Sequence, residues 1–122
     1  MTKSIVSDDI KKYLIPAFKR KVKSITALNV KTLSSYTDTI IIIECNSKRH
    51  VNSTAQYLIK ELKKTKMQTL GIEGVKDSDW ALLDYGEAVI HIFESNAKSF
   101  FDIEGLWADA PVIDLTNFEK SP

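Results

Sequence analysis

The 122-residue chain lacks several features that would narrow its function at once. Its only cysteine is Cys45, which excludes an intrachain disulfide and a cysteine-based zinc site. No apolar run is long enough to cross a membrane. The first residues also become polar too early for a secretory signal peptide. We therefore expect an intracellular protein, cytoplasmic in a bacterium, with no membrane partner.

The chain also has almost no excess of charge of either sign. Its 17 basic and 16 acidic residues leave a net charge of +1. A field this weak does not suit a protein whose affinity comes mainly from the nucleic-acid backbone, so we expect no strong independent nucleic-acid binding. With 43% hydrophobic and 27% charged residues, the composition is that of an ordinary globular protein. The length predicts a single domain over residues 1–122.

Most catalytic motifs are absent as well. The sequence has no phosphate loop, no dinucleotide fingerprint and no nucleophile elbow. His50 and His91 are far apart and have no metal-ligand spacing around them, so we expect no metal site and no cofactor. The pair Asp77 and Asp79 could hold magnesium, as carboxylates of polymerase-type sites do. Aspartates in such a loop more often form turns, and the sequence alone leaves both interpretations open.

The clearest structural signal is a β-hairpin. Residues 80–85 and 88–93 form two short apolar runs, and Gly86 between them can adopt the positive φ that a tight connection needs. Both faces of the predicted hairpin are largely apolar, which indicates cover on both sides. Asp84 and His91 are the polar exceptions, and we expect them to pair with each other. Trp80 and Trp107 can be core residues or contact residues.

The rest of the chain predicts a mixed sheet with helices. A helix begins near Ser7 and continues to Phe18, where Pro16 predicts a kink or two short helices. The four isoleucines at 40–43 predict a central strand buried on both faces. The expected elements are, in order, strands at 24–31 and 39–44, a helix at 48–64, a strand at 69–73, the hairpin, a helix at 95–106 and an irregular tail at 108–122 with a possible edge strand at 112–115. We therefore predict an α/β (α+β) fold, a mixed sheet of about five strands flanked by helices, with a parallel crossover over residues 39–73.

Short motifs between residues 23 and 107 resemble the iojap-like ribosomal silencing factors. The matching pieces, in the order of that family, are Thr37-Asp38, SKRHV at 47–51, GIEG at 71–74, DWALLDYG at 79–86, VIHIF at 89–93 and FFDIEGLW at 100–107. The resemblance implies a fold related to nucleotidyltransferases without their catalytic apparatus. It also implies binding to the large ribosomal subunit through the fourteenth protein of the conventional large-subunit numbering (uL14), at the intersubunit face. Bound there, such factors block joining of the small subunit when nutrients are short, and many form homodimers.

The resemblance also suggests which residues act. Residues expected to contact the partner are Glu73, Asp79, Trp80, Asp84, Tyr85 and Glu104. Residues expected to support them are Asp38, Arg49, His50, His91 and Trp107. Trp80 and Tyr85 would supply apolar contact area, and the acidic groups would face a basic ribosomal protein. Arg49 and His50 would either touch the partner or brace the helix start, and Trp107 would pin the last helix to the sheet.

The chain departs from the family pattern at a few positions. It has Thr39 where an aromatic residue is usual after Thr-Asp, and Lys98, Phe101 and Gly105 replace the usual Arg, Tyr and Lys. Two other functions stay open at this point. One is a nucleotidyltransferase-like enzyme that uses Asp77 and Asp79 with magnesium, and the other is a dimeric scaffold in a different assembly.

Overall fold

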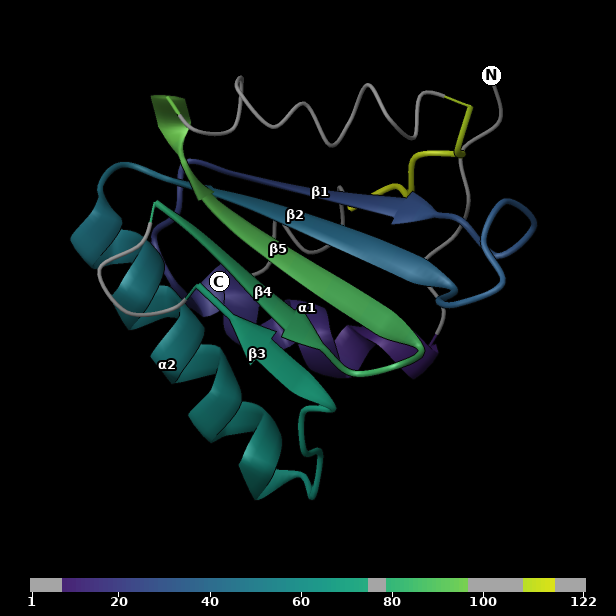
Figure 1. Ribbon diagram of the computed structural model, residues 1–122, viewed down its shortest axis with the longest axis horizontal. Coiled ribbons are helices and arrows are strands. Elements are labelled where there is room, and N and C mark those ends of the chain that lie inside the picture. Colours follow the sequence, from purple (N-terminus) through teal and green to yellow (C-terminus); the bar gives the residue numbers. More distant parts are fainter. Residues whose placement is uncertain (1–7, 75–78, 97–108, 116–122) are drawn as a thin grey trace.

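The computed structural model describes residues 8–74, 79–96 and 109–115. Two helices and five strands follow one another along these residues (Figure 1). Their bounds are α1 Asp8–Lys19, β1 Ser24–Asn29, β2 Thr39–Cys45, α2 Lys48–Lys64, β3 Gly71–Glu73, β4 Trp80–Asp84 and β5 Ala88–Glu94. The helix expected at 95–106 falls almost wholly outside the described residues. Neither helix is long and apolar enough to cross a membrane within the described part of the chain.

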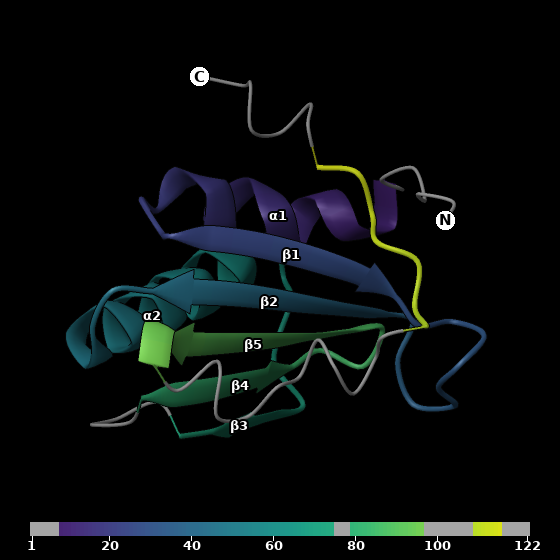
Figure 2. The same cartoon turned by 90° about the horizontal axis from the view of Figure 1, so that it is seen from above.

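The strands form one mixed sheet in the order β1-β2-β5-β4-β3 (Figure 2). β2 and β5 are parallel, and the other neighbours are antiparallel. β3 therefore runs in the same direction as β2, although β5 and β4 lie between them. This confirms the predicted five-stranded mixed sheet and the parallel sense of the crossover through α2. It also shows that the crossover spans two intervening strands.

Both helices pack on one face of the sheet (Figure 1). Alternate residues of each strand point to this face, as the two-residue period of a strand requires. The main core joins Ile41 and Ile43 of β2, Leu83 of β4 and Leu58 of α2, all with 0% exposure. A second buried cluster lies on the opposite face and contains Ile40, Ile42 and Phe93. The isoleucine run is thus buried on both faces of an interior strand, as predicted.

α2 matches its predicted bounds because two local signals agree. The Ser47 hydroxyl accepts a hydrogen bond from the His50 backbone N–H at 3.1 Å and caps the first turn. Val51, Ala55, Leu58 and Leu62 then follow at helical spacing and are each no more than 1% exposed.

α1 is a single helix from Asp8 to Lys19 with Pro16 inside it, so the alternative of two short helices is wrong, whereas the kink stays a prediction. Pro16 removes one backbone donor, which usually breaks or kinks a helix. Here Ile10, Tyr13 and Leu14 are buried against the sheet and α2, so tertiary packing outweighs the local penalty. The Tyr13 hydroxyl also donates to Glu87 at 2.7 Å, which ties α1 to the β4–β5 turn.

The described part of the predicted tail, residues 109–115, is irregular except for a short bridge at 112–113, within the predicted edge strand. It runs antiparallel beside β1, where the Ile113 N–H donates to the Ala27 carbonyl at 2.8 Å and the Asn29 N–H donates to Pro111 at 2.9 Å. Ala110, Ile113 and Leu115 are buried. The expected edge strand is thus a short bridge, which satisfies the backbone groups of β1 that face away from β2.

Gly86 gives the first testable prediction. Its φ is +83°, and an added Cβ would lie 3.2 Å from Cδ1 of Leu70. Gly86→Ala should therefore lower the free energy of unfolding by about 1–2 kcal/mol, mainly through backbone strain. Gly71→Ala is the matched control, because an added Cβ there meets nothing within 4 Å. Urea unfolding of both variants checks this, and equal effects at the two positions would contradict it.

Candidate protein-binding surface

Three aromatic rings of the β4–β5 hairpin gather on the sheet face opposite the helices. We call Trp80, His91 and Phe93 the aromatic face. The Trp80 ring lies 6.2 Å from Phe93 and 6.3 Å from His91, and the His91 and Phe93 rings are nearly parallel at 5.9 Å. Phe93 is fully buried, whereas Trp80 and His91 are half-buried. The strand period explains the grouping, because Trp80 is directly opposite Phe93 in the antiparallel pair.

A hydrogen bond joins Trp80 to His91, whose ring is neutral. The indole N–H of Trp80 donates to Nδ1 of His91 at 3.4 Å, so Nδ1 acts as an acceptor and the ring is neutral. Burial lowers the pKa of His91 to about 4. His91 therefore stays uncharged near neutral pH and positions the indole of Trp80.

The predicted pairing of Asp84 with His91 is wrong. Asp84 lies opposite Val89 in the strand register, whereas His91 lies opposite Leu82. Asp84 instead accepts the Gly86 N–H at 2.9 Å, which stabilises the hairpin turn. Its other carboxylate oxygen accepts a hydrogen bond from the Tyr36 hydroxyl.

Tyr36 is the residue that sequence reasoning missed. It lies in the loop between β1 and β2 and is 61% exposed. Its hydroxyl donates a hydrogen bond to Asp84, which is 48 residues away in the sequence. This hydrogen bond raises the pKa of Tyr36. The only sequence signal was an aromatic residue in a loop otherwise rich in small polar residues. Its ring adds exposed apolar area beside the carboxylate that we expected to contact a partner.

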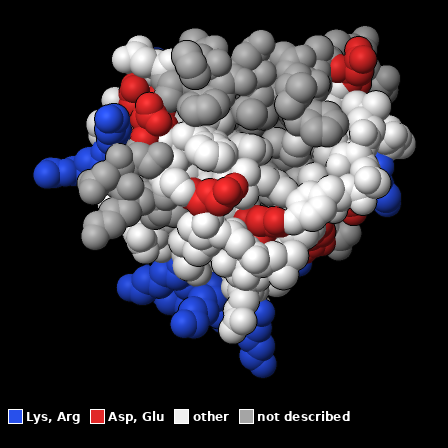
Figure 3. Space-filling view, in the orientation of Figure 1, with Lys and Arg blue, Asp and Glu red and all other residues white. Residues whose placement is uncertain are grey.

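The expected acidic residues that the structure describes lie on or beside β3 and β4. Glu73 is exposed on β3 and pairs with Leu82 of β4, so its side chain points to the same face as Trp80. Asp79 is half-exposed directly before β4. Figure 3 shows acidic groups over the middle of this view and basic groups at its lower edge, over the C-terminal end of α2. Glu104 and Trp107 lie outside the described residues.

Tyr85 does not belong to this surface, which corrects its expected shared contact with Trp80. Successive residues of a strand point to opposite faces, and Tyr85 is directed to the helix face. It is 7% exposed and its ring packs 5.4 Å from that of Tyr13. A partner bound to the aromatic face would not reach it.

The supporting residues have separate positions. Asp38 is exposed and its backbone N–H donates to Glu87 at 3.1 Å, beside the β4–β5 turn. Arg49 and His50 lie in the first turn of α2, away from the aromatic face. Nδ1 of His50 accepts the Asn46 N–H at 3.5 Å, which favours the helix-bracing role for this residue.

Comparison with known proteins identifies the family. A family model described as "Ribosomal silencing factor during starvation" matches residues 7–122. The chain belongs to this family. A ribosomal silencing factor of Haemophilus influenzae is 39% identical over 88 residues, which are 72% of this chain and 86% of that protein. A crystal structure of a Chromobacterium violaceum protein superposes with a TM-score of 0.76 at 31% identity, over 82% of this chain and 84% of that one.

The plastid relatives agree with the resemblance seen in the motifs. The chloroplastic Iojap protein of Arabidopsis thaliana is 30% identical over 101 residues, which are 83% of this chain and 42% of that protein. The iojap-like ribosomal silencing family predicted from the sequence is therefore confirmed. A silencing factor is a regulator, and silencing by binding requires no chemical reaction.

The magnesium hypothesis gains no support from this silencing-factor structure. Asp79 is described and half-exposed, whereas Asp77 lies outside the described residues. Over residues 8–74, 79–96 and 109–115, no group of three histidine, cysteine, aspartate or glutamate side chains could hold a metal ion. What the structure does place together is a set of three aromatic rings on one face of the β4–β5 hairpin.

Proposed function

We propose that this silencing factor binds the large ribosomal subunit and represses translation by preventing the small subunit from joining. The observation that carries the proposal is the family match over residues 7–122, together with the silencing function that the names of its bacterial relatives state. The proposed place of action is the cytoplasm, where those bacterial relatives would meet ribosomes. Outside the ribosome, we propose that the factor is a homodimer of single-domain chains.

We assign the contact to the aromatic face and the acidic groups around it. Half-buried Trp80 supplies amphipathic contact area at little cost in side-chain entropy, since its ring is already held by Phe93 and His91. Glu73, Asp79 and Asp84 give the surface an acidic character that suits a basic ribosomal protein. Charges of this kind speed association and orient the partner more than they add affinity. The proposed partner is uL14 at the intersubunit face.

The proposed mechanism is occlusion. The factor needs only to occupy the site where the subunits meet, so no bond is made or broken. The blocked fraction of large subunits rises with the ratio of free factor to its dissociation constant. A cell could therefore set the degree of silencing through the amount of factor alone.

Sedimentation with separated ribosomal subunits tests the proposal. The purified factor is incubated with large or small subunits, and the same mixtures are then assayed for formation of whole ribosomes. We expect cosedimentation with the large subunit only, and fewer whole ribosomes as the factor is added. Binding to the large subunit without any loss of joining would contradict occlusion. Binding to the small subunit alone would contradict the assigned partner.

A further inference from the structure

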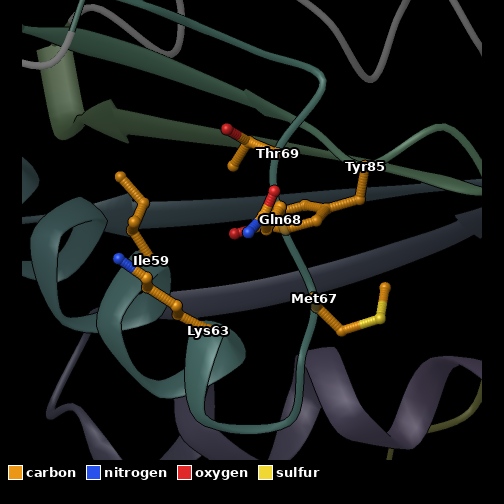
Figure 4. Close-up of a pocket in the computed structure, with 6 residues that line it drawn as sticks. All are labelled: Ile59, Lys63, Met67, Gln68, Thr69 and Tyr85. Atoms are coloured by element: carbon orange, nitrogen blue, oxygen red, sulfur yellow. The ribbon is translucent and has the colours of Figure 1, made fainter.

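A cavity of about 260 Å³ lies on the other side of β4 from the aromatic face. It is open to solvent and is bordered by the C-terminal half of α2, the segment that follows it and Tyr85 at the end of β4 (Figure 4). The residues that line it are Ile59, Lys63, Met67, Gln68, Thr69 and Tyr85. None of them was assigned to ribosome binding except Tyr85, which the fold removes from that surface.

The Tyr85 hydroxyl is the first feature of this pocket that points to a bound ligand. Tyr85 is only 7% exposed, and its hydroxyl oxygen is buried without a hydrogen-bond partner among the described residues. Buried polar groups without partners are rare in folded proteins, and each calls for an explanation. Burial raises the pKa of Tyr85 to about 12, so the hydroxyl keeps its proton and can donate it. Packing against Tyr13 holds the ring in place.

Lys63 supplies the charge. Its ammonium makes no ion pair within the described part of the chain, whereas the next residue, Lys64, is paired with Glu61 at 2.9 Å. The C-terminal end of a helix repels anions through its free carbonyl groups. Here the Leu62 carbonyl accepts from Thr65 and Met67, and the Lys63 carbonyl accepts from Lys66, which reduces that repulsion. These hydrogen-bonded carbonyls therefore oppose an anion beside Lys63 less than free carbonyls would.

The rest of the lining determines the size and polarity of the ligand. Ile59 and Met67 are partly buried against the core and supply the apolar part of the lining. Gln68 and Thr69 add an amide and a hydroxyl to the lining (Figure 4). An engineered cavity of about 150 Å³ holds benzene, so this volume suits roughly ten non-hydrogen atoms.

We propose that this pocket binds a small organic anion. Its carboxylate or phosphate group is held by Lys63 and, once the lining side chains shift to uncover it, by the Tyr85 hydroxyl, and its apolar part packs on Ile59 and Met67. The site is separate from the proposed ribosome contact and does not depend on it, because Tyr85 and Trp80 point to opposite faces of the sheet.

Titration of the full chain with defined probes tests the site. Benzoate and phenyl phosphate carry the two candidate head groups on one apolar ring, benzyl alcohol is the neutral control, and inorganic phosphate is the control without an apolar part. We expect saturable changes in the amide NMR signals of Gln68, Thr69 and Tyr85 with at least one aromatic anion. The tighter of the two anions identifies the head group. Equal binding of benzyl alcohol, equal binding of inorganic phosphate, or no saturable change with either anion would overturn the proposal.

Three variants separate this site from general charge attraction. Lys63→Gln and Tyr85→Phe should each weaken binding of the better probe by about tenfold or more, the scale of a hydrogen bond to a charged group. Lys60→Gln removes the same charge from the exposed side of α2 and should leave the dissociation constant unchanged. Tyr85→Phe should unfold at the same temperature or higher, because it removes only an unpartnered hydroxyl. Equal weakening by Lys60→Gln, or full binding by Tyr85→Phe, would contradict the assigned contacts.

Discussion

Trp80→Ala is expected to weaken binding to the large ribosomal subunit by about 2 kcal/mol or more, which is roughly thirtyfold in the dissociation constant. Trp80 is the largest side chain of the aromatic face, and two neighbouring rings and a hydrogen bond to His91 already order it. Its contact area would thus be gained at a low entropic cost. Titration of labelled factor against large subunits measures the change.

The control for Trp80→Ala is a variant that affects stability but not the proposed contact. Leu83 lies on the same strand, is fully buried and points to the helix face. Leu83→Ala should lower the free energy of unfolding by about 2–5 kcal/mol. Provided circular dichroism shows that it is folded, it should bind large subunits as the unchanged chain does. Equal losses of affinity in both variants, or normal binding by folded Trp80→Ala, would remove Trp80 from the interface.

The second large effect expected is a loss of stability in mild acid, caused by His91. Its pKa is about 4 in the folded chain, below its ordinary value of 6.5. Between these values the unfolded chain binds more protons than the folded chain, so stability rises with pH. The contribution is complete above about pH 6.5 and is lost as the pH falls towards 4. A difference of this size corresponds to roughly 3 kcal/mol.

Urea unfolding between about pH 5 and 7 measures this contribution with little interference from carboxylates. His91→Asn cannot titrate but keeps an acceptor near the Trp80 indole, so its stability should vary less with pH. His50→Asn is the control, because partial burial and the nearby Arg20 charge also lower the pKa of His50. The dependence of the free energy of unfolding on pH should change more for His91→Asn than for His50→Asn. The reverse order would contradict the role given to His91.

Local signals explain which parts of the fold were predicted correctly. The bounds of α2 follow from a capping serine and one apolar stripe, and the place of β2 follows from four consecutive isoleucines. Gly86 marked the hairpin because few other residues adopt its φ of +83°. Each of these signals lies within a few neighbouring residues, so no knowledge of tertiary structure was needed.

The parts that sequence reasoning missed depend on distant residues. The hydrogen bond from Tyr36 to Asp84 joins residues 48 positions apart. Asp84 and His91 are close in sequence, but the hairpin register, which depends on the geometry of the turn, places them opposite Val89 and Leu82 instead of each other. Pro16 does not divide α1 into two helices, because its penalty is local while the packing that outweighs it is tertiary. The strand period alone places Tyr85 and Trp80 on opposite faces of the sheet. The unpartnered hydroxyl of Tyr85, by contrast, could be seen only in the structure.

The short bridge between residues 111–113 and β1 bears on how the chain folds during its own synthesis. The central pair joins β2 to β5, whose paired residues are 49 positions apart, as for Cys45 and Glu94. The outer side of β1 gains its hydrogen bonds later still, because the Ala27 carbonyl accepts from the Ile113 N–H. Contacts so distant in sequence form slowly, and a strand edge left open in the meantime can associate with other chains. A nascent chain of this silencing factor would therefore expose unpaired backbone groups on the outer edge of β1 until residue 113 has emerged from the ribosome.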